Sequence, residues 1–198
     1  MVPGWLETVT NILQTQVLVK EELSGLPSAA HYASYDKEGA RIAIAGADGT
    51  VRVRATEGGT TQVLSCHDAT VRWVSWHPDG NQLLTASEDR TARVWHSNTP
   101  TKPLVLKGHK DTVNCAVWNS DGTMLATACN DGLVRLYRSG SATVLREFDG
   151  KAGQVGTVAF HPDDERIVAA FEDGSVLIWR IEGQRQPQRI DTGDRGAC

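Results

Sequence analysis

Short stretches in which apolar and polar residues alternate run along most of the chain. The alternation in RIAIA (41–45) and TVRVR (50–54) is typical of strands with one buried face. Between such stretches stand HPDG (77–80) and NSDG (119–122), which supply the Pro, Asp and Gly that tight hairpin turns need. No helical pattern falls between these strands. The pattern therefore predicts an all-β fold and excludes parallel βαβ units.

One unit of this pattern recurs along the chain. Four segments end alike, with aspartates 41, 42 and 42 residues apart: GADGTVRVRA (46–55), SEDRTARVWH (87–96), CNDGLVRLYR (129–138) and FEDGSVLIWR (171–180). Upstream segments keep steps of 42 residues: VRWVSWHPDG (71–80), VNCAVWNSDG (113–122) and VGTVAFHPDD (155–164). Each unit reads as four short strands, and a four-stranded unit of about 40–45 residues is the size of a propeller blade. The sequence therefore predicts a repeat protein.

On these motifs the chain resembles the WD-repeat β-propeller family, most strongly over residues 60–182. Four features recur there at the same spacing: a Gly-His, a hairpin Asp-Gly, an acidic turn and a terminal Trp. The resemblance implies an all-β propeller of about four four-stranded antiparallel blades, with partly degenerate repeats. The expected blades cover approximately 28–65, 66–107, 108–149 and 150–190, between an N-terminal lead-in (1–27) and a C-terminal tail (191–198).

The resemblance also implies that a hydrogen-bonded set of four side chains fastens each blade. The set comprises a Ser or Thr, a turn Asp, a Trp and a loop His, and it does not include the residue after the Trp, which is His96 in the second repeat. The assigned residues are His67, Thr85, Asp89 and Trp95 in the second repeat, His109, Thr127 and Asp131 in the third, Asp173 and Trp179 in the fourth, and Asp48 alone in the first. Tyr137 replaces the Trp of the third repeat, and Lys151 and Ala169 replace the His and Thr of the fourth.

Composition narrows the function. The formal charge of -4 and the scattered basic residues argue against a nucleic-acid-binding surface. No apolar run is long enough to cross a bilayer, and the first residues lack the layout of a secretory signal, so we expect a cytoplasmic protein. A bond between Cys115 and Cys129 is conceivable, but reduced, buried cysteines are favoured in such a chain.

No motif points to catalysis, a cofactor or a metal. DGKAGQVG (149–156) lacks phosphate-loop spacing, the Asp-Gly turns lack the closely spaced carboxylates that Ca²⁺ requires, and no Ser-His-Asp set is present. His67 and His109 are one repeat apart, which favours structural roles in separate blades. His77 and His161 lie beside prolines in hairpin turns, where we expect exposed side chains.

The face that carries the Asp turns is the candidate protein-binding face. Its mixed charge suits a protein or peptide partner more than nucleic acid. The residues assigned to it are Asp68, Arg72, Glu88, Arg90, Lys110, Asp111, Asn130 and Glu172. Arg90 stands where Gly132 and Gly174 occur in other repeats, which marks it as a possible specific contact or an ordinary turn residue. Trp73 stands where the next two repeats have the smaller residues Cys115 and Thr157, and a packing role is favoured over a role as a binding anchor.

The two ends of the chain predict an open arc. Val17–Val19 could supply an outer strand, but the fourth repeat can draw its own from Arg189–Asp191. The lead-in could alternatively contain an amphipathic helix over residues 4–14. Propellers of this family most often have about seven blades, so we expect four blades to leave open faces that pair with another copy, a partner or further sequence.

The family resemblance implies a non-enzymatic scaffold that presents loop surfaces to protein or peptide partners. An alternative is a regulatory or sensor segment of a larger signalling enzyme or multidomain protein. A hydrolytic or sugar-binding propeller is a third class, which predicts turnover or glycan retention.

Overall fold

The computed structural model describes residues 29–97, 102–183 and 186–190. Its hairpins form because each alternating segment is followed by a turn rich in Gly, Asp or Pro. The strands are β1 (Ala30–Tyr35), β2 (Arg41–Gly46), β3 (Thr50–Ala55), β4 (Gln62–Ser65), β5 (Val71–Trp76), β6 (Gln82–Ser87), β7 (Ala92–His96), β8 (Leu104–Leu106), β9 (Val113–Trp118), β10 (Met124–Cys129), β11 (Leu133–Arg138), β12 (Val144–Asp149), β13 (Val155–Phe160), β14 (Arg166–Phe171), β15 (Val176–Arg180) and β16 (Gln188–Ile190).

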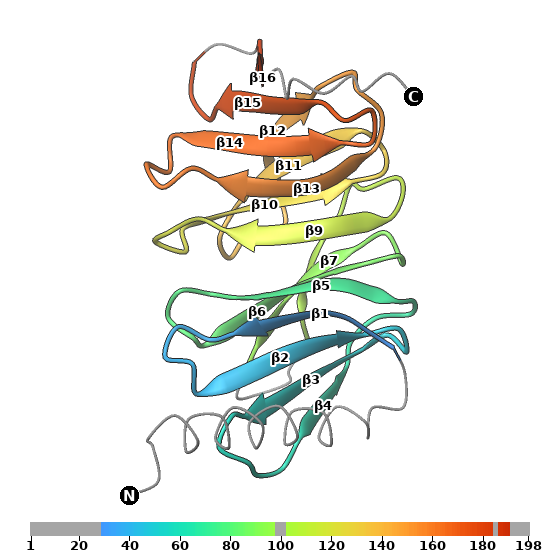
Figure 1. Ribbon diagram of the computed structural model, residues 1–198, viewed down its shortest axis with the longest axis vertical. Coiled ribbons are helices and arrows are strands. Elements are labelled where there is room, and N and C mark those ends of the chain that lie inside the picture. Colours follow the sequence, from blue (N-terminus) through green and yellow to red (C-terminus); the bar gives the residue numbers. More distant parts are fainter. Residues whose placement is uncertain (1–28, 98–101, 184–185, 191–198) are drawn as a thin grey trace, which may run out of the picture.

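The strands form four antiparallel sheets of four consecutive strands each, β1–β4, β5–β8, β9–β12 and β13–β16. We call these sheets blades 1 to 4. Blade 1 lies at one end of the long axis and blade 4 at the other (Figure 1). The first strands of the blades, β1, β5, β9 and β13, pack next to one another in that order and form the inner side of an arc. The predicted all-β propeller with four four-stranded blades is confirmed.

The core lies between blades, because residues on alternate sides of each strand face different neighbours. In blade 3, Thr127 faces blade 2, while Ala126 and Ala128 pack against blade 4. Three clusters of buried side chains join blade 1 to blade 2, blade 2 to blade 3, and blade 3 to blade 4. No such cluster within the described ranges joins blade 4 to blade 1, so the arc is open, as predicted.

Several predictions concern residues outside those ranges. The lead-in, the strand at Val17–Val19 and the tail all lie outside the described residues. The last described strand, β16, includes Arg189 and Ile190 of the segment that we expected to close blade 4.

Cys66, Cys115 and Cys129 are buried free thiols. Burial raises the pKa of the Cys66 thiol to about 12 and that of Cys129 to about 11. In the part of the chain that the structure describes, no helix is long and apolar enough to span a membrane.

Candidate functional site

Blade 2 brings together the four side chains assigned to its hydrogen-bonded set. His67 Nδ1 donates to Asp89 Oδ2 at 2.7 Å, and His67 Nε2 lies 2.7 Å from Thr85 Oγ1. The indole Nε1 of Trp95 donates to the same hydroxyl at 3.1 Å. The set therefore ties the loop before β5 to β6 and β7.

Asp89 is the centre of this set because its carboxylate collects donors from three segments. It accepts from Thr91 Oγ1 at 2.6 Å, from Arg93 Nη2 at 3.0 Å and from the backbone N–H of Asp68 at 3.3 Å. Burial raises the pKa of Asp89, but the hydrogen bonds from His67 and Thr91 outweigh it and hold the pKa well below its usual range. The carboxylate is therefore charged at neutral pH.

Blade 3 connects the corresponding residues differently. His109 Nε2 lies 2.8 Å from Thr127 Oγ1, but its Nδ1 does not bond to the turn Asp as His67 Nδ1 does in blade 2. Asp131 instead accepts from the backbone N–H of Lys110 at 2.9 Å and pairs with Arg135. Burial, aided by the charge of Arg135, lowers the pKa of His109 to about 4. The imidazole is therefore neutral at physiological pH.

An arginine four residues after the turn Asp recurs in three blades. The shortest Arg–Asp distances are 2.8 Å for Arg52–Asp48, 3.0 Å for Arg93–Asp89 and 2.9 Å for Arg135–Asp131. These arginines were not predicted from the sequence, although they recur there at steps of 41 and 42 residues. Asp48, expected to stand alone in the first repeat, therefore has a charged partner.

Blade 4 lacks this arginine, because Leu177 occupies its position. Asp173 accepts from the backbone N–H of Ser175 at 2.8 Å, and the nearest cation among the described residues is Arg189 at 3.9 Å. Trp179 is buried against Phe148 and Phe171. The structure thus does not bring Asp173 and Trp179 into one hydrogen-bonded set.

The prediction that His77 is an exposed turn residue is wrong. Only 14% of its side chain is exposed, and its ring packs edge-on against Trp118 with centroids 4.7 Å apart. Its Nε2 donates to the carbonyl of Gly122 at 3.2 Å. The neighbouring blade covers this turn, and the sequence of the turn alone does not predict such a contact. His161, the corresponding residue of blade 4, has 46% of its side chain exposed.

The inner strands share an irregularity that shapes a cavity. The pairing of each inner strand with the next strand skips its second residue, as a β-bulge does. A bulge redirects a side chain out of the regular alternation. The four bulge residues, His31, Arg72, Asn114 and Gly156, all line one cavity of about 560 Å³.

The remaining walls of this cavity, which we call the bulge cavity, come from strand ends and turns. Its other lining residues are Trp73, Asn130, Gln154, Ala170, Phe171 and Glu172. Trp73 stacks on Tyr32 of blade 1, with ring centroids 3.7 Å apart and planes inclined by 20°. Asn114 Nδ2 donates to Asn130 Oδ1 at 2.5 Å and to the carbonyl of Val155 at 2.9 Å, which fixes the amide between blades 3 and 4.

The structure divides the predicted binding face into two groups. Arg72, Asn130 and Glu172 line the bulge cavity, and Glu88 joins its rim through a 3.0 Å ion pair with Arg72. Asp68, Arg90, Lys110 and Asp111 are exposed on the neighbouring turns and loops and do not line the cavity. His31 and Asn114 were missed, because a bulge depends on strand pairing, which a single sequence does not show. Gln154, which directly precedes β13, was missed as well.

Arg90 adopts a left-handed backbone conformation with φ of 67°. The equivalent residues of the other blades are glycines, Gly49, Gly132 and Gly174, with φ between 78° and 87°. A residue with a Cβ costs roughly 1–2 kcal/mol in this region, so Arg90 destabilises this turn relative to a glycine.

We expect Arg90→Gly to stabilise the protein by about 0.5–1 kcal/mol, because it removes this strain at a modest cost in chain entropy. Arg90→Ala keeps the Cβ and should leave the midpoint of unfolding almost unchanged. Urea titration of both variants checks this, and a destabilised Arg90→Gly would show that the arginine contributes to folding.

Comparison with known proteins adds the family context. The family model described as "WD domain, G-beta repeat" matches residues 58–96, 101–138 and 142–180. The chain is 48% identical over 44 residues to the WD repeat-containing protein WDS homolog of Arabidopsis thaliana, covering 22% of this chain and 8% of that protein. It is 37% identical over 65 residues to WD repeat-containing protein 1 of Xenopus tropicalis, covering 31% and 11%. It is 40% identical over 63 residues to the nuclear distribution protein PAC1 of Ajellomyces capsulatus, covering 31% and 14%.

These relatives are thus matched over a small part of their own length.

Among the residues that the structure describes, no group of three His, Cys, Asp or Glu side chains could hold a metal ion.

Proposed function

Because the chain belongs to the WD-repeat family, we propose that it is a non-enzymatic scaffold that binds a protein or peptide partner at the bulge cavity and its rim. Proteins of this family typically mediate protein–protein interactions and are generally non-catalytic. The free thiols of Cys66, Cys115 and Cys129 fit a reducing compartment, which supports a cytoplasmic location.

One observation carries this proposal. The four bulge positions are structurally equivalent, yet they hold four different residues, His31, Arg72, Asn114 and Gly156. Residues that serve the fold of a blade are expected to repeat from blade to blade, as the turn aspartates do. A set that differs at each blade makes the cavity asymmetric, which suits recognition of an asymmetric ligand.

The chemistry of the cavity fits a polypeptide. The amides of Asn130 and Gln154 can donate to and accept from peptide groups, and Trp73 offers an aromatic surface. Arg72 and Glu172 place opposite charges in one cavity, which does not suit a polyanion such as nucleic acid.

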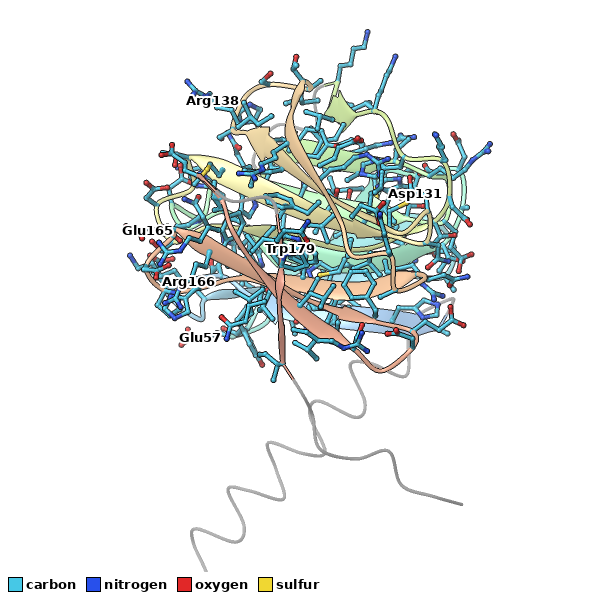
Figure 2. The ribbon with its side chains drawn as sticks, turned by 90° about the horizontal axis from the view of Figure 1, so that it is seen from above. Glu57, Asp131, Arg138, Glu165, Arg166 and Trp179 are labelled. Carbon is cyan, nitrogen blue, oxygen red and sulfur yellow. The ribbon has the colours of Figure 1, made fainter. Side chains whose placement is uncertain are left out.

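We expect Arg72→Ala and Glu172→Ala, which change two charged residues of the bulge cavity, to reduce capture of at least one partner roughly tenfold, the range of a contact that matters at an interface. The partners would be identified by affinity capture from cell extract with quantitative mass spectrometry. Arg138→Ala is the matched control, because Arg138 is exposed at the end of the blades opposite to Asp131 (Figure 2). If neither variant alters any interactor relative to the control, the proposed surface is wrong.

A further inference from the structure

Tyr35 occupies a position that is an interblade anchor elsewhere in the molecule. The last residues of the next two inner strands, Trp76 and Trp118, pair across the hairpin in the same way as Tyr35 does. Both tryptophans are packed against the preceding blade and are only 8% and 9% exposed. Tyr35 is 61% exposed, because no described blade precedes blade 1.

Each of these tryptophans is received by the first hairpin of the preceding blade. The guanidinium of Arg41 in blade 1 lies 4.5 Å from the ring centroid of Trp76, within the range of a cation–π contact. The imidazole of His77 in blade 2 meets Trp118 edge-on at 4.7 Å. One of two hairpin residues, a cation or a histidine, thus contacts the indole.

Blade 4 presents both kinds of receiver at once. The N–H of His161 bonds to the carbonyl of Arg166 at 2.9 Å, as that of Asp36 does to Arg41, so His161 and Arg166 stand where His77 and Arg41 stand in their own blades. Arg166 Nη2 lies 3.0 Å from His161 Nε2, and both side chains pair with Asp163, at 2.8 Å and 3.0 Å, while remaining 37% and 46% exposed. Figure 2 shows Arg166 at the hairpin end of blade 4.

The rest of this blade 4 face repeats an interblade surface. Val168 and Ile178 pair across the sheet and lie half-buried on the side opposite to Ala169 and Leu177, which pack against blade 3. The corresponding residues of blade 3, Ala126 and Leu136, are buried against blade 4. The aliphatic surface that receives a following blade is therefore present.

We propose that two copies of this chain join head to tail, with Tyr35 of each copy packed on His161 and Arg166 of the other. The outer strands of blades 1 and 4 extend to opposite sides of the inner strands (Figure 1), so a second arc can face both open ends. Four blades from each copy give eight, within the usual range of about four to eight for propellers. Two identical head-to-tail contacts close such a ring. This assembly goes beyond the proposed function and does not depend on a partner in the bulge cavity.

Sedimentation equilibrium of the purified full chain over a wide concentration range tests the assembly. The wild-type chain should show twice the chain mass. Tyr35→Arg places a cation against Arg166, and Arg166→Glu removes the cation that receives Tyr35, so each should weaken dimerisation at least tenfold. The double variant with both changes places opposite charges together and should recover most of the dimer.

Leu145→Arg is the matched control, because Leu145 is an exposed apolar residue on an outer strand, and it should leave the dimer intact. Thermal melts of all variants identify any loss of folding, and the recovery in the double variant cannot arise from a general loss of structure. A monomeric wild type at every concentration, single variants that dimerise normally, or a double variant no better than the single ones would overturn the proposal.

Discussion

Replacing Asp89 by alanine should destabilise the protein by about 3 kcal/mol, because it removes a buried charged acceptor and leaves its donors unpaired. The side chain of Asp89 is only 7% exposed, and that of His67 is fully buried. The nearest other carboxylate that the described residues offer to the guanidinium of Arg93 is that of Asp68, at 3.8 Å and on a side chain that is 94% exposed. Urea-induced unfolding of the wild-type and variant proteins measures the difference.

Asp173→Ala is the control for this variant. Asp173 occupies the same turn in blade 4, but its side chain is 43% exposed and pairs with Arg189 only at 3.9 Å. We expect a much smaller change in the free energy of unfolding. Asp48 is a poorer control than the sequence indicated, because it accepts from Arg52 and Thr50. Equal losses for Asp89→Ala and Asp173→Ala would mean that the set around Asp89 is not what holds the blade.

Acidification from pH 6.5 to pH 4 should cost about 3 kcal/mol of stability through His109 alone, as a pKa difference of about 2.5 units implies. The pKa of His109 is lowered from 6.5 to about 4 by burial and by the charge of Arg135. Between these values the unfolded chain binds more protons than the folded chain, so stability falls as the pH falls.

Urea titrations at pH 7, 5.5 and 4 check this dependence. Since burial also lowers the pKa of His67, the wild-type slope has more than one source. The informative quantity is the difference from His109→Gln, which should be clearly flatter and keeps a polar group near Thr127. His96→Gln, at an exposed strand end, should follow the wild type. Parallel curves for the wild type and His109→Gln would exclude the proposed role of this imidazole.

The blade architecture was predictable because its signals are local. Alternation and Asp-Gly turns specify each hairpin, and four copies of the pattern reinforce one another. The recurrence of Arg52, Arg93 and Arg135 is equally visible in the sequence. The hydrogen-bonded set that the family resemblance implies does not include these arginines, so they were not predicted.

Features that depend on contacts between blades could not be predicted from the sequence. His77 has the sequence context of an exposed turn residue, and only the position of Trp118 on the next blade explains its burial. The bulge cavity is a similar case, since Asn114 resembles any other strand residue until its pairing is known. The stack of Trp73 on Tyr32 joins residues 41 positions apart, which no local pattern specifies.

The placement of the core between blades also bears on how such chains change in evolution. Each cluster of buried residues draws on two neighbouring blades, and the contributing positions recur from one blade to the next. A duplicated unit of about 42 residues would therefore bring its own half of each new contact and meet a matching half on both sides. The number of blades is thus free to vary by duplication or deletion of whole units, whereas a deletion of half a unit would break two cores at once.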